Sequence, residues 1–452
     1  MARLKQFLVL VLILTALLSL TAFAEESEES GEPVITADYA CVYNVESGEM
    51  LYAKSANTTV YPGSLVKIMT AVLSLEYYDA NKHSDMEITV TESALAGLQG
   101  NNIKLKPGEK VSFYDLIAAV TVGGANDAAL VLAETVAGSV DKFVEMMNDK
   151  ARELGALNTK FANPTGFHSP MMYTTLSDLV KICAWANKNT AFMTLSSTLT
   201  YTMPATDFSK ERTFTNSNLL LDPSHWLRHY KKGTSGMNVG MTSEAGYTLA
   251  TVYNNDGQTN IVIIVGGKVD GWDYHYFNEA VALIDYTSVS YEYRKLVSRD
   301  MPVYDMKVLY GKDTDHVLLA TKSEVTALLP NDALDTDVTS DYTVVAEEIS
   351  APISKGAEMG TYNVYYQGKL VATVPLVAQG SIKRDYFSFV SGKIKLFFAR
   401  ETVKSVILLI VSLVIFSSVI AFIVHYYRKK RRLEQEREER MRRLSRARRT
   451  IK

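Results

Sequence analysis

Residues 61–71 read YPGSLVKIMTA, which places Ser64 three positions before Lys67 at the start of an apolar helix. Residues three apart on a helix share one face, with their Cβ atoms about 5–6 Å apart. Apolar neighbours such as Ile68 and Met69 would desolvate the lysine, lower its pKa and let it take the serine proton. The stretch therefore indicates a nucleophile and its general base.

The same spacing occurs a second time, at Ser139 and Lys142, so the pattern alone is a weak signal. Serine is a preferred N-terminal cap, and an amphipathic helical pattern begins directly after Ser139. We therefore expect Ser139 to cap a helix and Lys142 to be a solvated surface residue.

The N-terminal segment has the layout of a secretory signal. A basic start (Arg3 and Lys5) precedes an uncharged run, and Ala22-Phe23-Ala24 forms a small-residue cleavage site. We predict a signal peptide over residues 1–24 and an acidic linker over residues 25–32.

The C-terminal segment predicts a membrane anchor. Residues 405–424 carry no charge, and at about 1.5 Å per residue they can cross a hydrocarbon core of about 30 Å. We place a transmembrane helix at 405–425. The basic tail at 426–452 marks the cytoplasmic side, so the bulk of this cell-membrane protein should lie outside the cytoplasm.

Charge is distributed unevenly along the 452 residues. The net charge is −3 overall, but +9 over Arg428–Lys452 and +2 over the first 24 residues, which leaves −14 for residues 25–427. An acidic ectodomain argues against nucleic acid as a partner. Beside a membrane span, the basic tail determines topology and can contact anionic lipid.

Cysteine and histidine content indicates neither a disulfide framework nor a metal site. Cys41 and Cys183 are the only cysteines, and we do not expect them to pair. His225 and His229 have an H-x-x-x-H spacing, but a third ligand is missing nearby and Pro223 suggests a loop. We expect no metal and no cofactor.

Residues 33–291 mix β-rich and amphipathic helical patterns, whereas residues 293–383 consist of short β-type runs. The aromatic and basic stretch at 385–402 suits the outer membrane interface. Within the first block we predict two strands around the turn at 46–48, a helix from Gly63, helices at 113–122, 125–137, 140–154 and 278–286, and strands at 247–253 and 260–266.

Several stretches resemble, in the same order, the low-molecular-mass penicillin-binding proteins, the D-alanyl-D-alanine carboxypeptidases. They are AKSANTTVYPGSLVKIMTA, VTVGGANDAALVLAETV, KFANPTGFHSPMMYTTLSDL, MTSEAGYTLAT and APISKGAEMGTYNVYYQGKLVATVPLVA, and the resemblance covers residues 33–383. It implies a mixed α/β transpeptidase-like (β-lactamase-like) domain with a central antiparallel sheet flanked by helices, followed by a small all-β domain. It also implies a peptidoglycan stem peptide as substrate and β-lactams as covalent ligands.

The family uses three motifs around one cleft. By resemblance, Ser64 is the acylated nucleophile, Lys67 its base, and the backbone N–H groups of Ser64 and Met241 hold the oxyanion. The second motif, Ser-x-Asn, falls at Gly124-Ala125-Asn126, so the asparagine is present and the relay serine is absent. The third, Lys-Thr-Gly followed by an aromatic residue and threonine, falls at Asn238-Val239-Gly240-Met241-Thr242, without its cation and first hydroxyl.

These departures leave two functions open. Hydrogen bonds to charged groups contribute about 1.5–3 kcal/mol each, so losing two at the substrate carboxylate costs about 10²- to 10⁴-fold in rate. Lys231, Lys232 and Lys268 are candidate replacement cations, although we expect each to be a surface lysine. The chain is thus a serine D-Ala-D-Ala carboxypeptidase, or an impaired homologue that binds peptidoglycan or a partner protein as a scaffold.

Overall fold

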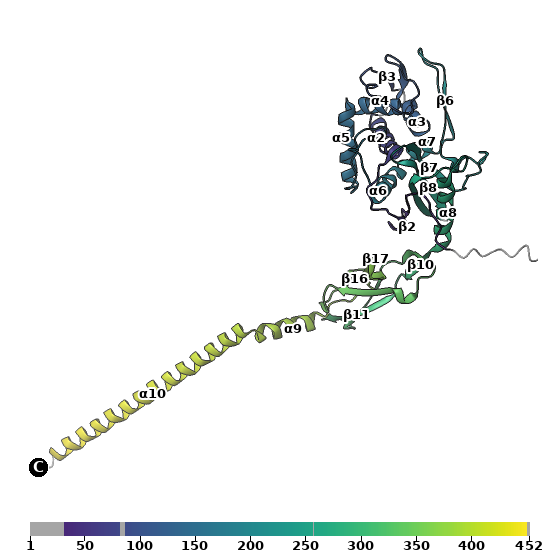
Figure 1. Cartoon of the computed structure of the whole chain (residues 1–452). Helices are drawn as coiled ribbons and strands as arrows, with labels where there is room; N and C mark the ends of the chain where they lie inside the picture. Colours follow the sequence, from purple (N-terminus) through teal and green to yellow (C-terminus); the bar gives the residue numbers. More distant parts are fainter. Residues whose placement is uncertain (1–30, 82–85, 256, 450–452) are drawn as a thin grey trace, which may run out of the picture. The chain divides into compact units, whose positions relative to one another are not determined.

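A computed structural model describes residues 31–81, 86–255 and 257–449, with side chains up to Leu444. The predicted signal peptide and nearly all of the acidic linker lie outside the described residues. The described chain forms two compact units (Figure 1). One runs up to Arg294 and includes Leu328–Ala333, and the other contains Lys295–Ala327 and the residues from Leu334 onward.

The first unit is built on a five-stranded antiparallel sheet of strand order β2-β1-β9-β8-β7. The predicted strand pair and both later strands are confirmed. The strands are β1 (Tyr39–Asn44), β2 (Met50–Lys54), β7 (Thr234–Thr242), β8 (Gly246–Asn255) and β9 (Gln258–Gly267).

Successive residues of these strands enter two different cores. Cys41 and Ile263, opposite each other in β1 and β9, belong to the larger core, whereas Val42 and Val262 belong to the smaller one. Because both faces of the sheet are covered, its central strands are nearly continuous runs of apolar residues.

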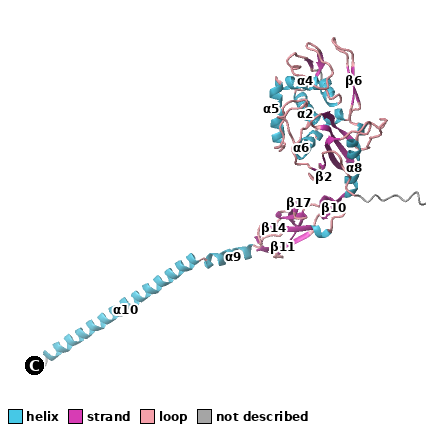
Figure 2. Cartoon of the chain, viewed as in Figure 1, coloured by secondary structure: helices cyan, strands magenta, loops and turns pink. Residues whose placement is uncertain are grey.

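Helices cover both faces of this sheet (Figures 1 and 2). The larger core contains α2 (Val66–Ala80), in which Val66 to Leu75 are all buried, as expected for a helix that is apolar on every side. The smaller core is closed by α8 (His275–Ser290). The other helices are α3 (Phe113–Thr121), α4 (Asn126–Ala137), α5 (Val140–Glu153), α6 (Leu176–Asn187) and α7 (Thr190–Ser196), so the predicted helices are confirmed.

The two Ser-x-x-Lys sequences differ in structure as predicted. Ser139 is the N-cap of α5, where its side chain accepts a hydrogen bond of 3.3 Å from the backbone N–H of Lys142. Ser64 instead lies in the short 3-10 helix η1 (Gly63–Leu65), which leads into α2.

Smaller elements complete the first unit. They are β3 (Glu87–Thr89), β4 (Lys110–Ser112), β5 (Thr200–Met203), β6 (Arg212–Thr215) and η2 (Leu219–Leu221). Cys41 and Cys183 are buried free thiols, and burial raises the pKa of each.

The second unit contains a six-stranded sheet of order β14-β16-β17-β12-β11-β15, in which β11 and β15 are parallel. β10 (Tyr291–Val297) and β13 (Val325–Pro330) form a separate pair. The six strands are β11 (Pro302–Leu309), β12 (His316–Thr321), β14 (Val338–Val344), β15 (Glu348–Ser350), β16 (Glu358–Tyr366) and β17 (Lys369–Ala378), with the turn η3 (Asp335–Asp337) before β14. The predicted fold class, an α/β unit followed by a β unit, is confirmed.

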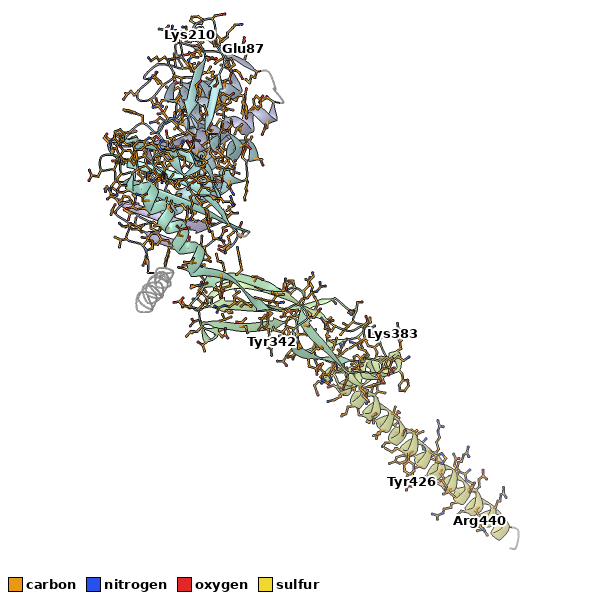
Figure 3. All side chains as sticks on the ribbon, turned by 90° about the vertical axis from the view of Figure 1, so that its right-hand side faces the viewer. Glu87, Lys210, Tyr342, Lys383, Tyr426 and Arg440 are labelled. Atoms are coloured by element: carbon orange, nitrogen blue, oxygen red, sulfur yellow. The ribbon has the colours of Figure 1, made fainter. Side chains whose placement is uncertain are left out.

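Two helices follow the β unit, α9 (Tyr386–Ala399) and α10 (Glu401–Arg449). Helix α10 is long and apolar enough to cross a membrane, with a mean hydropathy of 3.1 over its most apolar window, none of which is buried. From Arg428 onward the helix is rich in charged side chains, and Figure 3 shows Tyr426 and Arg440 projecting from the helix.

Candidate active site

Ser64 is positioned by a tight main-chain turn. Gly63 has φ = +52°, and a Cβ there would lie 3.0 Å from the Cβ of Ala245, so both conformation and space favour glycine. The turn ends at α2, whose first residues include Lys67. Sequence and structure therefore agree that the pair stands at the start of the central helix.

Lys67 is buried and held by a backbone carbonyl. Its side chain is 4% exposed, and Nζ donates a 2.6 Å hydrogen bond to the carbonyl oxygen of Thr165. Burial lowers the pKa of Lys67 from 10.5 to about 7. Near neutral pH a large share of this amine is therefore unprotonated and able to accept a proton.

The loop that supplies this carbonyl is itself well fixed. The Oδ1 atom of Asn163 accepts hydrogen bonds from the backbone N–H and hydroxyl of Thr165 and from the N–H of Gly166. Thr70, one turn along α2 from Lys67, donates a 2.7 Å bond to the carbonyl of Pro164. The loop thus contacts α2 at two successive turns.

The edge strand β7 forms the opposite wall. A Cβ on Gly240 would lie 2.2 Å from the Oγ of Ser64, so the main chain of β7 passes directly beside this serine. The hydroxyl of Thr248 in β8 donates to the carbonyl of Gly240 at 3.2 Å.

The second-motif position lies at the start of α4. Gly124 has φ = +63°, a conformation that a serine would adopt only with strain. Asn126 is 5% exposed; its Nδ2 donates to the carbonyl of Gln99 at 2.7 Å, and its buried Oδ1 has no partner among the described residues. This oxygen is free to accept a hydrogen bond from a ligand amide.

Asn101 borders the space that a serine side chain would fill. A Cβ on Gly124 would lie 3.5 Å from the Nδ2 of Asn101, which itself donates to the carbonyl of Gly123 at 2.8 Å. The backbone N–H of Asn126 donates to the carbonyl of Asn101, also at 2.8 Å. At Gly124, where the family's serine hydroxyl is missing, the side-chain amide of Asn101 therefore borders the cleft.

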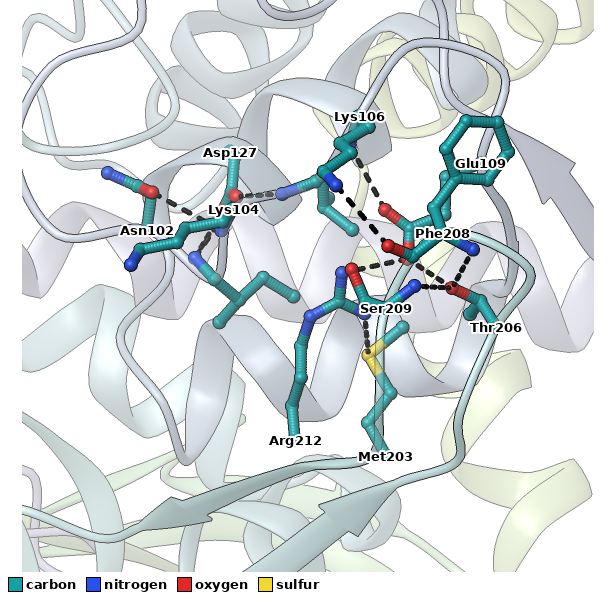
Figure 4. A network of polar contacts seen from close by, with 12 residues as sticks. Asn102, Lys104, Lys106, Glu109, Asp127, Met203, Thr206, Phe208, Ser209 and Arg212 are labelled. Atoms are coloured by element: carbon teal, nitrogen blue, oxygen red, sulfur yellow. Dashed lines mark hydrogen bonds and ion pairs between the residues drawn. The ribbon is translucent and has the colours of Figure 1, made fainter.

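Two buried carboxylates hold the loop that carries Asn101 (Figure 4). Asp127 accepts hydrogen bonds of 3.0–3.1 Å from the N–H groups of Ile103 and Leu105. Glu109 pairs with Arg212 at 2.7 Å and also accepts bonds from Thr206 and Lys106. Burial raises the pKa of Glu109, but these hydrogen bonds outweigh burial and the pKa is lowered overall.

These elements enclose one cleft of about 680 Å³. It brings together nearly all the predicted site residues: Ser64, Lys67, Gly124, Asn126, Val239, Gly240, Met241 and Thr242. Asn238 is the exception. It is 6% exposed, lies outside the cleft lining, and has a buried Oδ1 without a partner in the described part of the chain.

Among the described residues, no lysine or arginine side chain takes the place of the third-motif cation. Lys67 is the only lysine or arginine among the described residues that line the cleft. Lys231 pairs with Asp285 and Lys268 with Asp38, and neither lines the cleft; nor does Lys232. The described residues likewise contain no group of three or more His, Cys, Asp and Glu side chains placed to hold a metal.

Several lining residues were not singled out from the sequence. They are Asn101, Thr165, Phe167, His168, Ser217 and Glu244. Thr165 and His168 fall in the quoted stretch KFANPTGFHSP. Its resemblance to the family indicated that this region is important, but it did not identify which of its residues line the cleft. Ser217 and Thr242 place hydroxyl groups in the cleft wall, although neither occupies the position of the missing cation.

A family model described as D-alanyl-D-alanine carboxypeptidase matches residues 26–269, more than half of the chain. The chain belongs to the D-alanyl-D-alanine carboxypeptidase family. A second model, the C-terminal domain of penicillin-binding protein 5, matches residues 291–384. The family predicted from the quoted stretches is confirmed.

Relatives of this family match most of the chain. D-alanyl-D-alanine carboxypeptidase DacF of Bacillus subtilis is 28% identical over 368 residues, covering 81% of this chain and 91% of the relative. DacC of Escherichia coli is 29% identical over 382 residues, covering 81% of this chain and 89% of the relative. The crystal structure of penicillin binding protein 5 from Haemophilus influenzae matches with a TM-score of 0.61 and 26% identity, covering 78% of this chain and 99% of that one.

In this D-alanyl-D-alanine carboxypeptidase family member, acylation of Ser64 should depend on pH through Lys67. With a pKa of about 7, the lysine gains a proton and ceases to be a base as the pH falls below neutrality. We expect the acylation rate constant for a penicillin to fall about tenfold per pH unit below pH 7 and to level off above pH 8. The rate constant is measured by penicillin labelling that is quenched at successive times, at pH values from 5 to 9. A rate constant that does not change with pH would exclude Lys67 as the base.

The close approach of β7 predicts that Gly240→Ala blocks the nucleophile. The new methyl group would overlap Ser64, so the strand or the serine must shift. We expect labelling by penicillin to fall at least about 100-fold, because misplacement by an ångström costs that much. Gly380→Ala is the control, since a Cβ at Gly380 has no neighbour within 4 Å; equal labelling of the two variants would contradict the geometry.

Proposed function

We propose that this protein is a membrane-anchored, serine-type carboxypeptidase that removes the terminal D-Ala from peptidoglycan stem peptides through an acyl-enzyme. One observation carries the proposal: the buried, partly neutral Lys67 and Ser64 lie in one open cleft against the edge strand β7. Family membership supplies the substrate class, because both quoted relatives are named as carboxypeptidases of this specificity.

The proposed reaction begins with proton transfer from the Oγ of Ser64 to the Nζ of Lys67. The serine oxygen attacks the carbonyl carbon of the penultimate D-Ala, and the N–H groups of Ser64 and Met241 bind the resulting oxyanion. The C–N bond to the terminal D-Ala then breaks, and the proton held by Lys67 passes to the leaving amine. Water, deprotonated by Lys67, hydrolyses the ester and restores the serine.

Substrate positioning should rely on main chain and amides. The open edge of β7 offers N–H and C=O groups to an extended peptide, as in strand addition. Asn126 has a buried, unpartnered Oδ1 that can accept a bond from a substrate N–H. The substrate carboxylate, by contrast, meets no lysine or arginine other than Lys67 among the described lining residues, so we expect slow turnover.

The alternative function, a homologue that only binds, is not favoured. A binding-only function would explain why Gly124, Asn238 and Val239 replace the family's motif residues. It gives no role, however, to Lys67, whose burial disfavours the charged form of its amine. The cleft is open rather than filled by side chains, as a substrate site requires.

We also propose that α10 anchors the protein in the cell membrane as a single span. Its apolar run has the length of a bilayer core, and the basic residues from Arg428 onward favour a cytoplasmic tail. The exposed Phe387, Phe397 and Phe398 of α9 suit the outer interface.

Covalent labelling tests the enzyme proposal. The full-length protein in detergent is incubated with a fluorescent penicillin and analysed by intact mass. We expect one adduct per chain, absent in Ser64→Ala and retained in Ser139→Ala, since Ser139 is a helix cap. Release of D-Ala from a synthetic pentapeptide is measured in parallel; a wild-type protein that forms no adduct at high concentration would contradict the proposal.

Restoring the third motif should accelerate the reaction. Asn238→Lys with Val239→Thr returns a cation and a hydroxyl to the motif positions of β7. Because Asn238 is buried outside the cleft lining, the new lysine has to extend its longer side chain into the cleft. We expect acylation to rise at least tenfold, the lower part of the gain available from two hydrogen bonds to a carboxylate. Asn238→Gln is the matched control because it adds length without charge, and a gain common to both variants would show that charge is not what the cleft lacks.

A further inference from the structure

A second pocket, of about 400 Å³, lies on the α8 face of the edge strand β7. Its volume is within the range of small-ligand sites, about 300–1,000 Å³. Aromatic side chains make up about half of its lining residues, and Tyr247 stacks on Tyr276 with ring centroids 5.3 Å apart. The aromatic lining residues are Trp226, Trp272, Tyr247, Tyr274, Tyr276 and Phe277.

Two tryptophans at the pocket are largely exposed. The side chains of Trp226 and Trp272 are 64% and 72% exposed, and their rings meet edge to face with centroids 5.6 Å apart. Burying the face of a large aromatic ring is favourable in free energy. An adjacent pair of exposed rings beside a pocket therefore indicates a place where a ligand can pack.

The loops that carry these rings are fixed relative to each other. Asn278 of α8 contacts both: its Oδ1 lies 3.0 Å from the Nδ1 of His229, and its Nδ2 donates to Asp273 at 2.9 Å. Asp270 and Asp273 exchange two backbone hydrogen bonds of 2.9 Å, which places Trp272 on a tight turn. The two loops are thus positioned relative to each other before any ligand arrives.

The pocket adjoins the cleft at β7. Ser217, Val239, Gly240 and Met241 line both. A ligand whose peptide lies beside Ser64 can therefore continue past the strand and reach the aromatic rings.

The lining is uncharged but not wholly apolar. None of the described residues that line this pocket is Asp, Glu, Lys or Arg, while Ser217, His225 and Tyr274 offer hydrogen-bonding groups. A cationic ligand would require acidic side chains or an aromatic cage that surrounds it. A hydrocarbon chain would leave the polar groups of the lining without hydrogen-bond partners. A pyranose ring matches the pocket, because its C–H face is apolar and its rim carries neutral polar groups.

We propose that this pocket binds a neutral N-acetylated hexosamine ring of the glycan to which the stem peptide is attached, with the sugar face stacked on Trp226 or Trp272. The inference rests on the proposed function, since the stem peptide occupies the cleft while the sugar occupies the pocket. The enzyme thereby favours peptides still attached to their glycan over free peptides.

Calorimetric titration of the full-length Ser64→Ala protein in detergent tests this, because that variant cannot turn substrate over. The probes are a disaccharide pentapeptide, the same pentapeptide without sugar, and a tetrasaccharide of N-acetylglucosamine. We expect the disaccharide pentapeptide to bind at least about fivefold more tightly than the free peptide. In the double variant Trp226→Ala with Trp272→Ala this preference should vanish while free-peptide affinity is unchanged.

Two further variants control for folding and ring shape. Phe208→Ala removes an exposed aromatic residue of the β5–β6 connection and should retain the preference. Trp272→Phe keeps a flat ring and should retain part of it. Equal affinity for both peptides, or a preference that survives both tryptophan substitutions, overturns the sugar site. Geranyl phosphate is titrated as a lipid probe. If it binds in a tryptophan-dependent way while the tetrasaccharide does not bind, the sugar site is also overturned.

Failure of the proposed function would look different. Absence of a penicillin adduct on the wild-type protein contradicts the enzyme but leaves saccharide binding measurable, whereas a normal adduct with no sugar preference contradicts only the pocket.

Discussion

Burial of the Lys67 amine is the constraint on which the site depends. A charge taken out of water costs several kcal/mol, so folding favours the neutral amine, and the carbonyl of Thr165 satisfies one of its protons. The surrounding structure follows from this arrangement. Helix α2 has to be buried on all sides from Val66 to Leu75, and the loop at Asn163 has to be fixed accurately enough to present one carbonyl oxygen to one nitrogen.

Local sequence was sufficient to separate the two Ser-x-x-Lys copies. Ser64 follows a Pro-Gly turn and precedes a run without charges, whereas Ser139 precedes an amphipathic segment; the structure has a buried lysine in the first case and a helix cap in the second. Helix and strand positions in the first unit were predictable for the same reason, because periodicity and turn residues are local. The fold class and the family followed from the quoted stretches.

The remaining walls of the cleft could not be predicted, because they depend on contacts between distant segments. The partner of Lys67 is a main-chain oxygen, which no residue type reveals, and Asn101 reaches Gly124 only because Asp127 holds its loop. Asn238 matched a motif position yet lies behind the cleft surface. Trp226 and Trp272 are separated in sequence and meet because one amide, Asn278, bonds to both of their loops.

Glycine surrounds the nucleophile on three sides. Side chains at Gly63, Gly166 and Gly240 would collide with Ala245, with the carbonyl of Gly63 and with Ser64 itself. The backbone of β7 at Gly240 therefore lies directly beside the Oγ of Ser64, and substitutions elsewhere leave these backbone atoms chemically unchanged. This insulation allows evolutionary drift at Gly124, Asn238 and Val239 to alter what the enzyme recognises while the reaction centre keeps its form.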